Sequence, residues 1–245
     1  MAEPSKREKV YQVFQHISSS YDEANERISL GMEGRWKQQL IDAITKRAEP
    51  NGQVLDVCCG TGDIAIAIAA VRPDLTVIGL DFSPAMLQTA RQKSRRLDNV
   101  SWYEGDAMTL PFPDNTFASA CISFGLRNTS DYRQVLCEMT RVVRPGGWVY
   151  CLDSFVPDSP LIRPFYALYF RGIMPFLGGG IRHRQEYLWL WQSTREFLRK
   201  RQLLALFREV GLAHARMEGH LFGTCVLHKG QKRISTRNKR KMKTN

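Results

Sequence analysis

A glycine turn next to a carboxylate is the part of the sequence best suited to bind a ligand. The apolar run Val54–Val57, which contains Asp56, leads into Gly60-Thr61-Gly62 and then into a second apolar run. Gly60 and Gly62 can adopt backbone angles that a Cβ would forbid, so main-chain N–H groups can approach a ligand in front of a helix. We therefore expect Gly60, Thr61 and Gly62 to bind an anionic or carboxylate group, with Asp56 bracing the turn. The turn alone also fits the G-x-G-x-x-A dinucleotide fingerprint.

Two further aspartates follow later apolar runs. Asp81 ends the run Thr76–Asp81, about 20 residues beyond the glycines, where a carboxylate can accept hydrogen bonds from both hydroxyls of a ribose. Asp106 can accept from an adenine amino group beside the amide of Ala107. Structural readings remain open, because Asp81 could cap the helix that Ser83 begins and Asp106 could close a turn.

The elements that must position these residues alternate between strand and helix. Short apolar runs predict strands, and patterns of helical period lie between them. The predicted strands are 54–57, 76–81, 100–104, 117–124 and 148–155, and the predicted helices are 64–70, 84–97 and 131–143. Such alternation indicates an α/β domain with a parallel sheet. A helix over 194–210 and a closing pair of strands within 213–228 are expected to complete it.

Segments outside this alternation define the domain organisation. Residues 1–47 are predicted to form an N-terminal helical flap, because 8–47 carry helical periodicity. The α/β domain spans 48–228 and contains an aromatic-rich insertion at about 156–192, which we interpret as a lid. The remaining residues, 229–245, form a basic tail that is predicted to be disordered.

The charge of the chain is concentrated in that tail. The formal net charge is +11, and the tail carries eight Lys or Arg and no acid, which leaves 11 − 8 = +3 for the rest. A tail of this kind is either a solvated segment or a contact for acidic lipid or RNA. The body of the protein therefore gives no indication of nucleic-acid binding.

The six cysteines form no C-x-x-C pair and lie mostly among apolar neighbours, so we expect buried thiols and no metal or disulfide. The first residues lack a signal-peptide apolar region, and no apolar run reaches the roughly 20 residues needed to span a bilayer. We expect a cytoplasmic protein.

Taken together, the glycine turn, Asp81, Gly105-Asp106-Ala107 and Pro145-Gly146-Gly147 resemble the class I S-adenosylmethionine-dependent methyltransferases. This resemblance implies a Rossmann-like fold with a seven-stranded, mostly parallel sheet and helices on both faces. It also implies S-adenosyl-L-methionine as methyl donor, without a metal. A nicotinamide enzyme would explain the turn and Asp81, but not Gly-Asp-Ala or the Ser-Pro-x-Met-Leu motif that begins at Ser83.

More specific stretches resemble the ubiquinone/menaquinone biosynthesis C-methyltransferases. They include 14–22, 29–37, 56–63 and above all 123–128, which reads Ser-Phe-Gly-Leu-Arg-Asn. The resemblance implies methylation of a ring carbon of a prenylated quinol, with a demethylmenaquinol favoured over a benzoquinol. The residues that it assigns to the cofactor are Thr61, Asp81, Asp106, Ala107 and Ser123. It places Arg127 and Asn128 facing the reacting ring. The chain departs from the family at Glu33-Gly34, where His-Arg is usual, and at Phe197-Leu198, where Phe-Pro is usual.

The chemistry implied is attack by a carbon nucleophile, which requires the electron-rich quinol rather than the quinone. Arg127 would stabilise the forming phenolate and Asn128 would orient its oxygen, although Arg127 could instead form a structural ion pair. The prenyl tail suggests peripheral contact with an anionic membrane at its inner face, and a homodimer is an open expectation.

Three rival functions stay open. They are a small-molecule O- or N-methyltransferase, an RNA methyltransferase recruited by the tail, and a non-catalytic assembly factor. No nucleic acid is expected as substrate, because the strand over 117–124 is not followed by the (Asp/Asn)-Pro-Pro-Tyr motif and Cys121 does not follow a proline.

Overall fold

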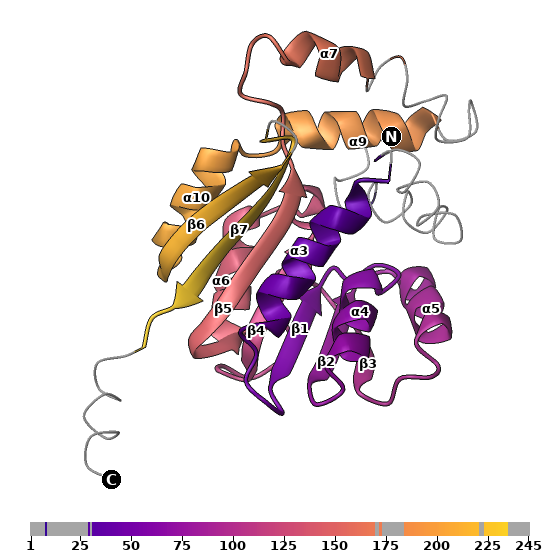
Figure 1. Cartoon of the computed structure of the whole chain (residues 1–245), viewed down its shortest axis with the longest axis vertical. Helices are drawn as coiled ribbons and strands as arrows, with labels where there is room; N and C mark the ends of the chain where they lie inside the picture. Colours follow the sequence, from indigo (N-terminus) through magenta and orange to yellow (C-terminus); the bar gives the residue numbers. More distant parts are fainter. Residues whose placement is uncertain are drawn as a thin grey trace.

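The structure is a computed structural model, and it describes residues 8, 29, 31–169, 172, 184–220 and 223–234. Strands and helices alternate as far as β5, except that β4 follows β3 without a helix between them (Figure 1). After β5 the described residues form the helices α7, α9 and α10 and the antiparallel pair β6 and β7. The strands are β1 Gln53–Val57, β2 Thr76–Asp81, β3 Val100–Glu104, β4 Phe117–Ser123, β5 Val143–Ser154, β6 Leu212–His220 and β7 Cys225–Lys232. The helices are α3 Glu33–Thr45, α4 Asp63–Val71, α5 Pro84–Lys93, α6 Tyr132–Val142, α7 Arg163–Leu168, α9 Arg184–Glu196 and α10 Lys200–Glu209, with a 3₁₀ turn, η1, at Leu126–Asn128.

One seven-stranded sheet forms the centre of the molecule, in the order β3-β2-β1-β4-β5-β7-β6. The strands β1 to β5 pair in parallel, and β7 runs antiparallel to both of its neighbours. One face of the sheet packs against α3 and α4, and the other packs against α6 and α10. This arrangement confirms the predicted α/β fold with a mostly parallel sheet and helices on both faces.

The strand order reverses between β1 and β4, so the loops after these two strands diverge and leave a crevice at the carboxyl ends of the sheet. The registers bring those ends to one level, since Val57 pairs with Leu80 and with Ile122, and Asp81 pairs with Glu104. The predicted ligand residues that follow β1 to β4 therefore meet at one edge.

Local sequence signals account for α5, whose first turn begins at Pro84. The Ser83 side chain accepts a hydrogen bond from the Met86 backbone N–H, which is the N-cap interaction that the sequence predicted. The helix ends at Lys93, earlier than the predicted end at residue 97.

The predicted end of α6 was nearly right, but the predicted start of the next strand was wrong. β5 begins at Val143, so Pro145-Gly146-Gly147 lie inside the strand instead of before it. The β4–β5 register shifts between Phe117 and Ser119, and this irregularity accommodates the extra residues. A Cβ on Gly147 would lie 2.5 Å from the Ala118 carbonyl oxygen, so only glycine fits there.

The helix predicted over 194–210 is two helices, α9 and α10, separated at residues 197–199. Phe197 is buried at this break and packs against Phe155 and Tyr132, with ring centroids 5.2 and 5.1 Å apart. Gly211 follows α10 with φ +92°, as expected of a residue that ends a helix.

The C-terminal strand extends four residues past the predicted domain boundary at 228, because β7 continues to Lys232. Lys229, counted in the predicted tail, is only 4% exposed, and its Nζ lies 2.6 Å from a carboxylate oxygen of Glu218. The predicted disorder of the tail concerns 235–245, which lie outside the described residues. Most of the predicted flap before residue 31, and lid residues 170–171 and 173–183, lie outside them too.

Candidate cofactor and substrate site

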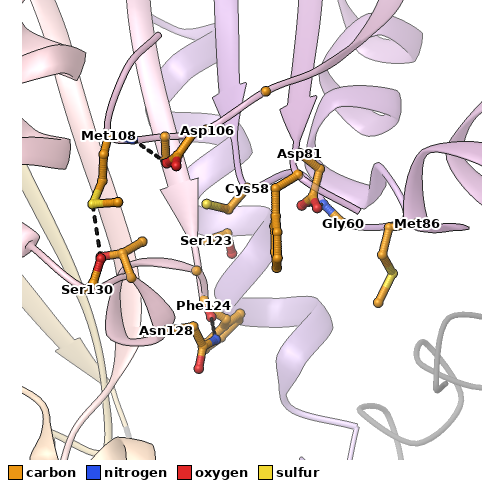
Figure 2. A pocket seen from close by; sticks show the side chains of 15 residues that line it. Cys58, Gly60, Asp81, Met86, Asp106, Met108, Ser123, Phe124, Asn128 and Ser130 are labelled. Atoms are coloured by element: carbon orange, nitrogen blue, oxygen red, sulfur yellow. Dashed lines mark hydrogen bonds between the residues drawn. The ribbon is translucent and has the colours of Figure 1, made fainter. Parts of the chain in front are cut away.

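A pocket of about 810 Å³ lies at the carboxyl ends of β1 to β4, where the strand order reverses (Figure 2). Each of these strands, or the loop after it, supplies part of the wall. The lining residues are Cys58, Gly60, Asp81, Phe82, Met86, Gly105, Asp106, Ala107, Met108, Ser123, Phe124, Gly125, Asn128, Thr129 and Ser130. The structure thus brings together Gly60, Asp81, Asp106, Ala107, Ser123 and Asn128, which the sequence had predicted as ligand residues.

Asp81 lies in the wall of this first pocket and also holds two loops together. One carboxylate oxygen accepts from the Gly60 N–H at 2.8 Å and the other from the Ser83 N–H at 2.9 Å. Burial raises the pKa of Asp81 to about 6, despite these hydrogen bonds. Asp81 can hold the two loops and also bind a ligand, because a carboxylate oxygen accepts more than one hydrogen bond.

If Asp81 binds a ribose, as the sequence predicts, this pKa makes the affinity for that ligand depend on pH. Ribose hydroxyls would favour the ionised carboxylate and lower its pKa in the complex, so binding releases a proton below pH 6 and affinity rises with pH. If only the ionised form binds, affinity is expected to be about tenfold weaker at pH 5 than at pH 8, measured by calorimetry. The Asp81→Asn variant should bind the cofactor weakly, and its affinity should depend less on pH. An unchanged pH profile in this variant would assign the titration to another group, such as Asp56.

The loop after β3 supplies one corner of the first pocket, with both polar and apolar groups. Asp106 accepts from the Met108 N–H at 2.9 Å, and Figure 2 shows its carboxyl group in the loop that also carries Met108. Met108 and, across the pocket, Met86 add thioether surface, which suits a flat aromatic ring. The corner can therefore hold a purine by its faces and by its amino edge.

The glycine turn has an open side and a packed side. Gly60 has φ +55°, and a Cβ built there would meet no atom within 4 Å, so its backbone can approach a ligand directly. Gly62 has φ +86°, but a Cβ there would lie 2.3 Å from the Trp102 ring. Gly62 does not line the first pocket and serves helix packing. Asp56 accepts from the Ala65 N–H at 3.2 Å and so holds the first turn of α4, which follows the glycine turn that Asp56 was predicted to brace.

A second pocket, of about 380 Å³, lies between this turn and α3. It shares Cys58, Gly60, Ser123 and Phe124 with the first pocket. Its other lining residues are Glu33, Lys37, Asp56, Cys59, Thr61, Asp63 and Ile64. Thr61, predicted as a ligand residue, is 2% exposed, and its hydroxyl accepts from the Lys93 Nζ at 3.3 Å.

The wall shared by the two pockets carries backbone strain and an unsatisfied hydroxyl. Cys58 and Phe124 both have φ +54°, which is unusual for residues with a side chain. The buried Ser123 Oγ has no hydrogen-bond partner among the described residues. Strain and an orphaned polar atom at one wall are expected where a ligand completes the interactions.

Arg127 lies behind the first pocket and does not line it. Its guanidinium is 2.5 Å from Asp153, which is completely buried, and its backbone N–H also bonds that carboxylate at 3.2 Å. The guanidinium also lies 5.6 Å from the centre of the Phe124 ring. The structure thus contains the ion pair that the sequence left open, and the predicted contact of Arg127 with a reacting ring stays a prediction.

Asn128 does line the first pocket, and a tryptophan fixes its side chain. The Trp189 indole N–H donates to Asn128 Oδ1 at 3.2 Å, and Asn128 Nδ2 donates to the Phe124 carbonyl at 3.3 Å. Trp189 comes from α9, at the end of the predicted lid.

Sequence reasoning missed several of these residues. Trp189 was counted only as one aromatic of an insertion, and no spacing rule connects it with Asn128. Asp153 could have been found, because a lone acid in an apolar strand needs a partner. Glu33 and Lys37 carry no motif that would predict a place in the second pocket.

The fold and the residues in the pocket define a class I methyltransferase. The family described as the ubiE/COQ5 methyltransferase family matches residues 2–232, so the chain belongs to this family. Demethylmenaquinone methyltransferases of Staphylococcus aureus strains JH9 and Newman are 42% identical over 228 residues, which is 92% of this chain and 94% of theirs. The predicted family is therefore confirmed, and the chain is an enzyme of the S-adenosylmethionine-dependent methyltransferases.

Solved structures agree on the fold. An S-adenosylmethionine-dependent methyltransferase from Thermotoga maritima has a TM-score of 0.63 at 18% identity, with 91% of this chain and 99% of that chain covered. Phosphoethanolamine N-methyltransferase 2 of Haemonchus contortus, solved with S-adenosyl-L-methionine, has a TM-score of 0.61 at 16% identity, with 80% and 53% covered.

Two features are absent from the described residues. Among those residues, no three or more His, Cys, Asp or Glu side chains are grouped so that they could hold a metal ion. No helix in the described part of the chain is long and apolar enough to cross a membrane.

Proposed function

We propose that this protein transfers a methyl group from S-adenosyl-L-methionine to a ring carbon of a prenylated quinol, specifically demethylmenaquinol. The observation that carries the proposal is the 42% identity over 92% of the chain to enzymes named demethylmenaquinone methyltransferases. A benzoquinol is the second candidate, because the family description covers both the ubiE and COQ5 branches.

The site has the donor and acceptor groups that this cofactor needs. Asp81 would accept from the ribose hydroxyls, and Asp106 with the Ala107 amide would hold the adenine edge. The open space before Gly60 and the orphaned Ser123 hydroxyl would receive the part of the cofactor near the sulfur. When bound, S-adenosylmethionine supplies an electrophilic methyl group.

The residues on the substrate side would favour an electron-rich ring. A quinol pushes electron density onto its ring carbon best when one phenolic oxygen carries negative charge. The Asn128 amide, held by Trp189, can orient such an oxygen. Arg127 lies behind Phe124 and stays cationic, so its field would stabilise the anion, although Asp153 partly neutralises it.

Trp189 is expected to act as a positioning residue for Asn128. Trp189→Phe keeps most of the apolar volume but removes the indole N–H, so Asn128 loses the donor that fixes its Oδ1. We expect kcat to fall about tenfold, with little change in cofactor affinity. Trp191→Phe is the matched control from the same helix. Equal loss in both variants would indicate a general effect on α9.

We also propose that α7 contacts the membrane that holds the substrate. Phe165 and Leu168 in α7, and Leu161 just before it, recur at helical spacing and are 72%, 63% and 81% exposed. Tyr166 points the other way, toward Trp191, with ring centroids 6.0 Å apart. An apolar face of this kind suits the interfacial region of a bilayer, and the cations within 235–245 would add attraction to anionic lipid.

Vesicle binding tests this contact. Phe165→Ser combined with Leu168→Ser should reduce co-sedimentation with anionic vesicles at high salt, where attraction by the tail is screened. Deletion of 235–245 should reduce binding only at low salt. The deletion must spare Gln231 and Lys232, whose side chains bond Gly146 and Asn115. Unchanged vesicle binding by the α7 double variant would contradict the proposed contact of α7 with the membrane.

The substrate class is tested by presenting the purified enzyme with several acceptors in detergent. A demethylmenaquinol, the corresponding demethylated benzoquinol, phosphoethanolamine and a structured RNA are each incubated with radiolabelled S-adenosylmethionine. We expect label chiefly in the demethylmenaquinol. Preferential labelling of phosphoethanolamine or RNA would replace the proposed function by one of its rivals.

A further inference from the structure

We propose that Glu33 and Lys37, one turn apart on α3, bind the amino-acid end of the cofactor, with Glu33 accepting from its ammonium and Lys37 donating to its carboxylate. The inference rests on the proposed cofactor and deepens it. It gives α3 a ligand-binding role.

The first support is where the two side chains lie. Both line the second pocket, and their side chains are only 11% and 19% exposed. Ser29 accepts from the Glu33 N–H at 3.2 Å and fixes the start of α3, so the helix presents these residues from a defined position. A buried pair of opposite charges that faces a cavity costs desolvation energy, which a ligand of matching charge would repay.

The second support is the charge balance of the pocket. Lys37 Nζ lies 2.5 Å from Glu33 and 2.8 Å from Asp63, and Lys93 pairs with Asp63 as well. Burial disfavours the Lys37 ammonium, but Glu33 and Asp63 together raise the pKa of Lys37 above its ordinary value. Lys37 and Lys93, which lies just outside the pocket, balance the charges of Glu33 and Asp63. Asp56 also lines the pocket, and burial raises its pKa to about 7. A zwitterion can therefore enter without adding a net charge.

The third support is the connection to the first pocket. Cys58, Gly60, Ser123 and Phe124 line both pockets, so they form one wall between the nucleoside-binding corner and the charged cluster. A ligand held by Asp81 and Asp106 at one end can extend past Gly60 to α3. The backbone N–H groups at the start of α4 add donors for a carboxylate there.

A second pair, at the C-terminal end of α3, provides a matched control. Asp42 and Lys46 have the same i,i+4 spacing and a 3.2 Å ion pair, but their side chains are 44% and 73% exposed and line neither pocket. Their replacement changes the charge of α3 in the same way without touching the site.

The test compares ligands that differ only at the amino-acid end. S-adenosylhomocysteine carries this end, and 5′-methylthioadenosine lacks it. In calorimetry, Lys37→Met should weaken S-adenosylhomocysteine binding about tenfold or more and change methylthioadenosine binding by less than about twofold. Lys37→Arg should retain part of the affinity for S-adenosylhomocysteine. Lys46→Met should leave the affinity for both ligands unchanged.

Glu33 is tested with the desamino analogue of S-adenosylhomocysteine. Glu33→Gln should weaken the binding of S-adenosylhomocysteine. It should not weaken the binding of the analogue, because the analogue has no ammonium group for Glu33 to accept from. If Lys37→Met weakens the binding of both nucleosides equally, or of neither, the proposal is wrong. Circular dichroism will show whether a variant has unfolded. These assays contain no quinol, so a failure of the proposal about Glu33 and Lys37 does not contradict the proposed substrate. A wild-type protein that binds neither nucleoside would contradict the proposed cofactor.

Discussion

Arg127→Leu is expected to destabilise the protein by about 3–5 kcal/mol, measured as the free energy of unfolding in urea, because it leaves the Asp153 carboxylate buried without its cation. Asp153 is completely buried, and its Oδ1 lies 2.5 Å from the guanidinium. The Ser154 N–H also bonds that oxygen, at 2.8 Å, but a neutral donor cannot balance the charge. The ion pair between Arg144 and Glu49 is the control, since these side chains are 38% and 72% exposed and Arg144→Leu should cost less than about 1 kcal/mol.

The same ion pair allows the structural and catalytic roles of Arg127 to be separated. Replacing both partners, with Arg127→Met and Asp153→Leu, removes the unpaired charge and should recover much of the lost stability. If Arg127 also stabilises a phenolate, this stable double variant should still turn over on the order of 10²-fold more slowly than wild type. Full turnover in the double variant would leave Arg127 only its structural role.

Asp81→Ala is expected to weaken S-adenosylmethionine binding by about 100-fold or more, measured by calorimetry. The substitution removes a carboxylate that can make two charge-assisted hydrogen bonds to a ribose, and it also releases the N–H groups of Gly60 and Ser83. Both loops that shape the pocket would then loosen. Asp98→Ala is the control, because Asp98 is exposed and precedes β3 at the opposite edge of the sheet. Affinity within about threefold of wild type for Asp81→Ala would exclude Asp81 from the cofactor site.

The parallel core of the fold could be predicted because each strand is a short apolar run that ends at a strong local signal. Ser83 and Pro84 begin α5, and Gly60 and Gly62 define the turn before α4. Parallel strands present their carboxyl ends at one edge, so the meeting of Asp81 and Asp106 at the first pocket followed from sequence position alone.

Features that depend on distant partners could not be predicted in the same way. Lys229 appears in the sequence as the start of a basic tail, yet Glu218 across the β6–β7 pair holds it in a strand. The break between α9 and α10 places Phe197 in the core, although the apolar spacing through 194–210 is continuous. The Arg127–Asp153 pair joins residues 26 positions apart, and Pro145-Gly146-Gly147 fits inside β5 only because the β4–β5 pairing is irregular there.

The most direct test of the proposed function is to locate the methyl group transferred to demethylmenaquinone in the presence and absence of a reductant. The enzyme is incubated with S-adenosylmethionine that carries a ¹³C-labelled methyl group, and the product is examined by mass spectrometry and carbon NMR. We predict one labelled methyl group on the ring carbon beside the prenyl chain when dithionite supplies the quinol, and no product from the oxidised quinone. Label on oxygen, or equal methylation of the oxidised ring, would contradict carbon methylation of a quinol.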